Sequence, residues 1–560
     1  MFRDTRGIVC KNESMNKTGW ALRHVYSLRF PVSVVAAWRA HDEQAAAFLK
    51  WFLQTKTFRM TRSSGQSSGR VIERLLQGLL VVLYLAGMAL VWKWFADDAI
   101  GAWAFGLALI LGAPFVVVIV FVAAATALRT AGYLCRPKRL GKAVVGYVLE
   151  QQVIRLRLKH RFTVVAVAGS VGKTSTKLAI AQLLGQHLRV RYQAGNYNDR
   201  VTVPLVFFGL TQPSLFNPFA WMRVFGHIAA SLHEPYPYDV VVIELGTDGP
   251  GQMQQFDYLR PDLTVLTAIS PEHMEHFGTI DAVAAEECSV FDYSRLVLAG
   301  VDDIAPKYLV GRQFTAYSLR KHTSGSYFAE SSRPNLGGQF LQIHAPSGMI
   351  AGHTKFVGQP GAASVLAAVA AADVLGLKRA VVAEAISQLE PFAGRLQVLD
   401  GVQGSKLIDD TYNASPLAAK AALDVLYGSR TKQRIAVLGS MNELGDYARQ
   451  AHQEVGAYCD PQKLDYVLTL GRDAERWLAP AARQTGCVVH SFSSQSACAA
   501  FVRKQLKPGA TVLVKGSQNG VFAEEVVKHL LAHPGDASKL VRQSPEWMRR
   551  KRTPASDGGW

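Results

Sequence analysis

Two long apolar segments stand out in the first 160 residues of the chain. Residues 75–92 and 99–128 contain no charged side chain, and only the short polar stretch 93–98 separates them. Because about 20 apolar residues span the hydrocarbon core of a bilayer, both segments have the required length. Basic residues flank the pair on both outer sides, which places both ends in the cytoplasm by the positive-inside rule. The pattern predicts a transmembrane helical hairpin at 75–128, with a pair of buried core helices as the alternative.

From about residue 161 the pattern changes to short β-branched segments that alternate with helical ones. This alternation is typical of parallel α/β sheets. The strands form two series with a break near Pro391, which predicts two α/β domains at 161–390 and 391–540. The predicted strands lie at residues 163–169, 238–246, 262–270, 295–300, 405–410, 434–439, 465–471 and 511–517.

Charge adds three basic regions to this outline. The formal net charge is +18, and basic residues gather in the region 1–74, whose true start is uncertain, in the linker 129–160 and in the tail 541–560. Basic chains usually meet nucleic acid, anionic lipid or anionic substrates. Because two of these regions flank the predicted hairpin, we expect membrane lipid as a partner and no nucleic acid. The six cysteines form no CxxC pair, which indicates reduced thiols and no structural metal site.

A glycine-rich turn, GSVGKT at residues 169–174, follows the first of these strands and precedes a helical stretch. Backbone N–H groups at the start of a helix can converge on phosphate oxygens. Lys173 would then reach the β- and γ-phosphates of a nucleotide, and Thr174 would ligate Mg²⁺. The full pattern has another glycine five residues before Gly172, where this chain has Val167, so a chance glycine turn is the alternative. The expected nucleotide contacts are Gly169, Ser170, Val171, Gly172, Lys173, Thr174 and Ser175.

Together with this turn, seven later segments resemble the Mur ligase family in sequence and in order, over residues 164–527. They are GNYNDRVTVPL, VIELGTDGPGQM, AISPEHMEHFGT, FAGRLQVL, IDDTYNASP, VLGSMNELG and VLVKGS. The resemblance implies a central P-loop ATPase domain and a Rossmann-like C-terminal domain, with ATP and Mg²⁺ as cofactors. Such ligases transfer the γ-phosphoryl group of ATP to a carboxylate, and an amine then displaces phosphate from the acyl phosphate.

The resemblance also implies roles for single residues. Glu244 would share a Mg²⁺ with Thr174, His273 would bind a second Mg²⁺, and Arg395 would reach the γ-phosphate. Without the resemblance, Glu244 is equally a helix cap, a lone histidine is more often structural, and Lys515 is either a solvated lysine or close to the substrate. The other implied nucleotide contacts are Asp410, at the ribose, and Asn413. The expected substrate residues are Asn196, Asn198 and Lys515, and the expected catalytic residues are Lys173, His273, Glu287 and Arg395.

Three departures from the family pattern set this chain apart. Glu287 stands where the family has a carbamylated lysine at the second Mg²⁺, and it supplies the same charge at shorter reach. Pro360 and Ser364 stand where the family has a histidine and an asparagine near the nucleotide. The family's N-terminal domain, which grips the UDP portion of the substrate, is absent, and the predicted hairpin occupies its place.

The closeness of the central motifs favours a UDP-muramoyl tripeptide as the carboxylate and D-alanyl-D-alanine as the amine, in peptidoglycan precursor synthesis. A related membrane-tethered ligase that uses a lipid-linked or different acyl acceptor, or another amine, is the alternative. A catalytically decayed nucleotide-binding membrane protein is a further alternative, which the retained motif residues disfavour. The expected location is the bacterial inner membrane, as a multi-pass protein with its catalytic domains in the cytoplasm.

Overall fold

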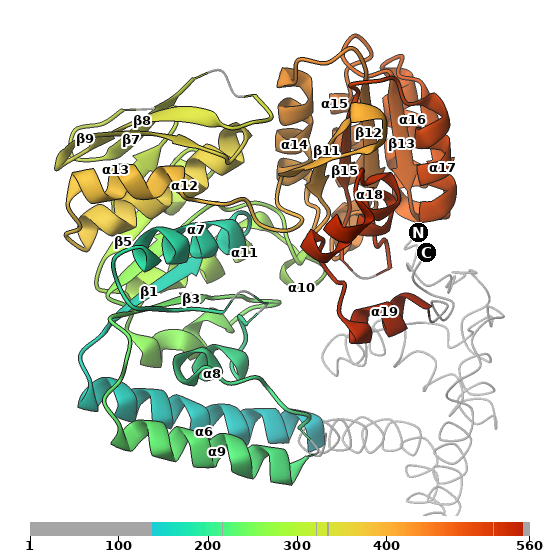
Figure 1. Cartoon of the computed structure of the whole chain (residues 1–560). Coiled ribbons are helices and arrows are strands. Elements are labelled where there is room, and N and C mark those ends of the chain that lie inside the picture. Colours follow the sequence, from blue (N-terminus) through green and yellow to red (C-terminus); the bar gives the residue numbers. More distant parts are fainter. Residues whose placement is uncertain are drawn as a thin grey trace, which may run out of the picture. The chain divides into compact units, whose positions relative to one another are not determined.

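The computed structural model describes residues 137–552, except for 194, 196, 216, 321, 333, 334 and 519. From residue 142 onward the described residues belong to one compact unit, which contains two separate β-sheets. Figure 1 shows the first sheet with its helices in cyan to yellow and the second in orange to red.

Nine strands form the first sheet, in the order β2-β3-β1-β4-β5-β6-β7-β8-β9. The strands from β2 to β7 pair in parallel, and β8 and β9 extend the sheet by antiparallel pairing. Ligand sites of open α/β sheets lie at the carboxyl ends of their parallel strands. The strands are β1 (Thr163–Ala168), β2 (Val190–Arg191), β3 (Val240–Glu244), β4 (Leu263–Leu266), β5 (Val297–Gly300), β6 (Thr315–Ser318), β7 (Tyr327–Ser331), β8 (Gln339–Ala345) and β9 (Gly348–Thr354).

Side chains of β1 alternate between two cores, one on each face of this sheet. Val165 and Val167 pack with α7 and α12, whereas Val164 and Ala166 pack with α6 and α8. The many alanines of α12 let it pack directly beside α7, as Figure 1 shows. The helices of this part are α6 (Pro137–Lys159), α7 (Lys173–Gly185), α8 (Thr202–Phe208), α9 (Pro218–His233), α10 (Met274–Phe277), α11 (Ile280–Glu287), α12 (Gly358–Val374) and α13 (Arg379–Ser387).

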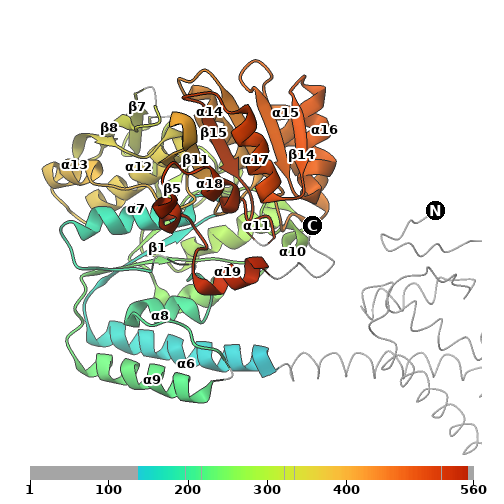
Figure 2. The ribbon, with the colours of Figure 1, turned by 45° about the vertical axis from the view of Figure 1, so that its right-hand side comes forward.

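Six strands form the second sheet, in the order β10-β11-β15-β12-β13-β14, and only β10 is antiparallel. Helices cover both faces of this sheet (Figure 2): α14, α15 and α16 pack on one core, and α17 and α18 on the other. The strands are β10 (Gln397–Asp400), β11 (Lys406–Asp410), β12 (Arg434–Gly439), β13 (Tyr466–Leu470), β14 (Val489–Phe492) and β15 (Thr511–Lys515). The helices are α14 (Pro416–Gly428), α15 (Ala448–Tyr458), α16 (Ala479–Gln484), α17 (Gln495–Gln505), α18 (Glu524–Leu530) and α19 (Pro545–Arg552).

The predicted α/β fold with parallel sheets is confirmed, and each of the predicted strands is present. Strands β6 to β9 were not predicted; they add a partly antiparallel extension to the first sheet. The predicted domain limits stay predictions, although the break near Pro391 falls between the last strand of the first sheet and the first strand of the second.

The predicted location in the bacterial inner membrane is contradicted. Over residues 137–552, apart from the gaps, no helix combines the length and the apolar character that crossing a bilayer requires. The segments on which the prediction rested, 75–92 and 99–128, lie outside the described residues, as do the basic region 1–74 and the end of the tail. The predicted lipid partner therefore has no support in the part of the chain that the structure describes.

Candidate active site

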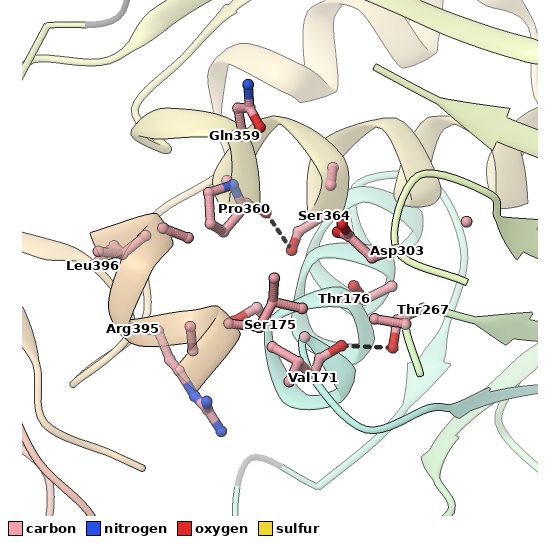
Figure 3. A pocket seen from close by; sticks show the side chains of 18 of the residues that line it. Val171, Ser175, Thr176, Thr267, Asp303, Gln359, Pro360, Ser364, Arg395 and Leu396 are labelled. Carbon is pink, nitrogen blue, oxygen red and sulfur yellow. Dashed lines mark hydrogen bonds between the residues drawn. The ribbon is translucent and has the colours of Figure 1, made fainter. Parts of the chain in front are cut away.

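The glycine turn between β1 and α7 has the shape of a phosphate-binding loop. Gly169 and Gly172 have φ values of 117° and 88°, a region that glycine enters without the steric cost of a side chain. A Cβ atom on Gly169 would lie 2.4 Å from the Thr267 hydroxyl. That hydroxyl donates a hydrogen bond of 2.7 Å to the carbonyl of Val171 (Figure 3), which ties the turn to the end of β4. The first N–H groups of α7 are thus presented at the carboxyl end of the sheet.

Lys173, the first residue of α7, lies among carboxylates. Its Nζ is 3.3 Å from Glu272 Oε1 and 3.8 Å from Glu287 Oε1. Burial lowers the pKa of Lys173, but the charges of Glu272, Glu287 and Glu244 outweigh burial and raise it overall. Lys173 therefore stays positively charged at neutral pH, and this charge is what would offset the negative charge of a triphosphate.

A second group of side chains meets at Thr174. The Thr174 hydroxyl donates to Glu244 Oε1 at 3.2 Å, and Arg395 Nη2 donates to the Thr174 hydroxyl oxygen at 3.1 Å. Arg395 comes from the loop before β10, so the second sheet supplies a cation to the phosphate loop of the first. Lys177, one turn further along α7, pairs with Glu244 Oε2 at 3.1 Å. A hydroxyl and a carboxylate this close together are the oxygen donors that Mg²⁺ prefers, so the predicted pair fits the ion.

Glu287 ends α11 with its side chain fully buried. Its Oε2 accepts a hydrogen bond of 2.7 Å from the N–H of Gly169, so the carboxylate supports the phosphate loop directly. Burial raises the pKa of Glu287, against the opposing charge of Lys173. Glu272, which precedes α10 and has its side chain 15% exposed, completes a group of two carboxyl groups around Lys173.

His273 directly follows Glu272, but its ring pairs with carboxylates from two other loops. Its backbone has a φ of 46°, and its Nδ1 is 3.3 Å from Glu443 Oε2 in the loop after β12. Its Nε2 is 3.7 Å from Asp248 Oδ1. The ring of His273 thus pairs with Glu443 and Asp248 rather than with Glu287, the other residue predicted at the second Mg²⁺. Over the described part of the chain, no three His, Cys, Asp or Glu side chains gather as a metal site.

Asp410 and Lys515 end two neighbouring strands of the second sheet. Lys515 Nζ lies 2.5 Å from Asp410 Oδ2 and donates to the Asn413 carbonyl at 3.0 Å. Both side chains are buried, so Lys515 is not the solvated lysine that the sequence left open. Asn413 uses its own side-chain oxygen to accept from the N–H of Ala414.

A cavity of about 230 Å³ is lined by residues from the regions of both sheets. Figure 3 shows it between α7, α12 and the loop that carries Arg395. Asp410 and Lys515 line it on the side of the second sheet. Pro360 and Ser364 line it on α12, and the Ser364 hydroxyl donates to the carbonyl of Pro360 at 3.0 Å. That hydroxyl is therefore already engaged within its own helix.

The structure describes one of the two asparagines that the sequence predicts at the substrate. Asn196 lies outside the described residues. Asn198 packs against Gly246, which lies just past the end of β3. A Cβ atom added to Gly246 would lie 2.4 Å from Asn198 Nδ2. Sequence reasoning missed Lys177 and Glu272. Lys177 follows Thr174 by three residues, so its place on the same helix face was a usable signal; Glu272 had no comparable signal.

A phosphate loop, a hydroxyl–carboxylate pair suited to Mg²⁺ and an arginine from a second α/β sheet define a nucleotide-dependent phosphoryl-transfer enzyme. The family model for the Mur ligase middle domain matches residues 167–372, and that for the Mur ligase glutamate ligase domain matches residues 394–518. The chain belongs to the Mur ligase family. It is an ATP-dependent acid–amino-acid ligase, with ATP and Mg²⁺ as cofactors.

Several relatives are UDP-N-acetylmuramoyl-tripeptide–D-alanyl-D-alanine ligases. The one from Synechocystis sp. is 29% identical over 409 residues, 70% of this chain and 81% of the relative. The one from Bacillus subtilis is 27% identical over 402 residues, 69% of this chain and 79% of the relative. Two solved structures share the fold, each with a TM-score of 0.57 over 69% of this chain. They are MurF from Acinetobacter baumannii, 22% identical over 79% of that chain, and MurF ligase from Thermotoga maritima in complex with ADP, 21% identical over 83% of that chain.

Replacing Glu272 by glutamine should change how stability depends on pH. Burial, with the charge of Glu287, raises the pKa of Glu272 from 4.5 to about 8 against the pull of Lys173. The stabilising contribution of a carboxyl group with a raised pKa is complete below the unfolded value and is lost as pH rises through the folded one. Between pH 5 and pH 8.5, nucleotide-free parent protein should therefore lose on the order of 5 °C in melting temperature relative to Glu272→Gln. If the melting temperatures of the parent and of Glu272→Gln change with pH in the same way across this range, the pKa of Glu272 is not raised.

Proposed function

We propose that the chain joins the carboxylate of a UDP-muramoyl tripeptide to the amine of D-alanyl-D-alanine, with ATP as phosphoryl donor. Relatives that carry this activity in their names match the chain over 81% and 79% of their own lengths. The observation that carries the chemistry is the contact between Arg395 and Thr174, since it brings a cation of the second sheet to the phosphate loop of the first.

The reaction must bring a carboxylate against a triphosphate, so cations have to offset the repulsion between them. We propose that Lys173 contacts the β- and γ-phosphates and that Arg395 contacts the γ-phosphoryl oxygens from the opposite sheet. A carboxylate oxygen attacks the γ-phosphorus, and ADP leaves. The amine then attacks the acyl carbon, and phosphate leaves with the oxygen that came from the carboxylate.

Thr174 and Glu244 are the residues that we propose to hold Mg²⁺. Bound there, the ion would neutralise charge on the β- and γ-phosphates. Lys177, nearly fully buried, pairs with the second carboxylate oxygen of Glu244 and so fixes the orientation of the first. Lys515 does the same for Asp410, which we propose as the contact to the ribose hydroxyls.

A ligation assay with omitted components tests this proposal. Purified full-length protein, ATP and Mg²⁺ should release phosphate only when both the UDP-muramoyl tripeptide and D-alanyl-D-alanine are present, with one amide product per phosphate. UDP-muramoyl dipeptide and single D-alanine serve as mismatched controls of the same chemistry. Phosphate release that follows a different carboxylate or amine would reject the proposed substrates but keep the ligase chemistry.

A further inference from the structure

The end of the described chain returns to the candidate active site. Residues 540–552, which we call the C-terminal arm, lie beyond the family match, which ends at residue 518. Arg542 of the arm donates to the carbonyl of Tyr412 at 3.0 Å and to the carbonyl of Thr411. Its Nε and Nη2 also donate to the two carboxylate oxygens of Glu524 at 2.9 and 2.8 Å. The arm therefore grips the loop that directly follows β11.

The loop that Arg542 holds carries Tyr412, whose ring lies against Arg395. The guanidinium of Arg395 lies 4.1 Å from the centre of the Tyr412 ring, a cation–π contact. The N–H of Tyr412 donates to the carbonyl of Gly394 at 3.1 Å. A Cβ atom on Gly394 would come within 3.0 Å of both Tyr412 N and Val541 Cγ1, so arm, loop and Arg395 segment are in close contact. Contacts thus run without interruption from Arg542 through Tyr412 to Arg395 and Thr174.

The attachment of the arm itself is strong. Glu524 is fully buried and pairs both with Arg542 and with Lys551, whose Nζ is 2.8 Å from Glu524 Oε1. Burial raises the pKa of Glu524, but the hydrogen bonds and charges of Arg542 and Lys551 outweigh it and lower the pKa overall. A buried carboxylate with two cationic partners holds both of them in place. Arg542 also has a φ of 56°, which non-glycine residues seldom adopt and which surrounding bonds must maintain.

We propose that Arg542 is a positioning residue for the ligase reaction. It fixes the loop at residues 411–412, the Tyr412 ring orients the guanidinium of Arg395, and the C-terminal arm is thereby part of the active site. The inference rests on the proposed role of Arg395 at the γ-phosphoryl group. Arg395 needs such support because it lies in a loop between α13 and β10, and a long side chain there would otherwise sample many rotamers.

The test separates turnover from nucleotide binding. Arg542→Lys keeps the charge but cannot reproduce the forked donation to two carbonyls and a carboxylate. In the full chain it should lower kcat by about 10-fold, because small displacements of a catalytic group have effects of this size. The dissociation constant of ADP, which lacks the γ-phosphoryl group, should change by less than about twofold. Arg550→Lys is the matched control, because Arg550 lies on α19 with its side chain 60% exposed, and its ion pair with Glu546 and its contact with the Trp547 ring both stay within that helix.

Two substitutions at Tyr412 test the middle of the same chain of contacts, even if Arg542→Lys fails to fold. Tyr412→Phe keeps the ring and should retain parental kcat, whereas Tyr412→Leu removes the ring and should lose about as much as Arg542→Lys. Equal kcat for the two Tyr412 variants would overturn the inference.

A double-mutant cycle distinguishes this inference from the function on which it rests. If Arg542 acts through Arg395, Arg542→Lys should cost less than about twofold in kcat when Arg395→Lys is already present. If Arg395→Lys lowers kcat strongly and Arg542→Lys lowers it by its full factor again in the double variant, the inference about Arg542 is overturned while the proposed role of Arg395 stands. Parental activity of Arg395→Lys would overturn the proposed role of Arg395 and the inference with it.

Discussion

Lys173→Ala should abolish ligation. The substitution removes the cation at the start of α7 and leaves the carboxyl groups of Glu272 and Glu287, both close to the phosphate loop, without their cationic partner. Because this lysine offsets charge where phosphoryl transfer occurs, we expect kcat to fall by about 10³-fold or more. Phosphate release and amide product should be measured together, after the melting temperature has shown that the variant is folded.

A surface lysine provides the control for this substitution. Lys463 is 51% exposed, pairs with Asp460 and lies in the loop before β13 of the second sheet, so Lys463→Ala should retain parental rates. Near-parental ligation by folded Lys173→Ala would remove the phosphate loop from the mechanism.

Glu287→Gln should raise the Mg²⁺ concentration that the enzyme requires and lower its rate. Glutamine keeps the oxygen that accepts from Gly169 but removes the charge that we propose to serve the second Mg²⁺ in place of a carbamylated lysine. Carboxylate oxygens are the ligands that Mg²⁺ prefers, and a metal that stabilises transition-state charge contributes several kcal/mol. A loss on the order of 10²-fold in kcat is therefore expected at low Mg²⁺.

The neighbouring residue offers a matched control on the same helix. Glu286 is also buried, but its carboxylate accepts from the N–H groups of Gly251 and Met253 and lies outside the phosphate loop. Glu286→Gln should lower the melting temperature without shifting the Mg²⁺ requirement. If Glu287→Gln matches the parent at every Mg²⁺ concentration, Glu287 only supports the turn at Gly169.

Dissolved bicarbonate tests the same residue in another way. An enzyme that depends on a carbamylated lysine needs CO₂ to form it, whereas a glutamate needs none. The parent protein should therefore be equally active in bicarbonate-depleted and bicarbonate-supplemented buffer, and Glu287→Lys should recover part of its activity only in the supplemented one. Bicarbonate dependence of the parent would show that a lysine elsewhere carries this function.

The parts of the fold that the sequence predicts are those in which one local pattern decides the outcome. Buried parallel strands such as Val240–Glu244 are short apolar runs, and a glycine turn between a strand and a helix has few other uses. The antiparallel extension at β8 and β9 escaped prediction because burial in β8 does not follow residue type, since Gln339 is buried and Phe340 exposed, and β9 has no regular burial pattern. Their signal is weaker than that of a continuous apolar run.

The site shows the same division between local and long-range information. Lys173 and Thr174 are set by the turn that carries them, whereas the contact of Arg395 with Thr174 joins residues 221 positions apart. The packing of Glu272 against Lys173 and the grip of Arg542 on residues 411–412 depend likewise on how distant segments meet. Family resemblance supplied Arg395 and Glu287, and no motif pointed to Glu272 or Arg542.

The fate of one oxygen atom tests the central claim most directly. If the enzyme forms an acyl phosphate, a UDP-muramoyl tripeptide with both oxygens of its reacting carboxylate replaced by ¹⁸O should pass one ¹⁸O atom to each inorganic phosphate released during ligation with D-alanyl-D-alanine. Mass spectrometry of the phosphate measures this transfer. The account predicts singly labelled phosphate in a one-to-one ratio with the amide product. Ligation that yields unlabelled phosphate would contradict it.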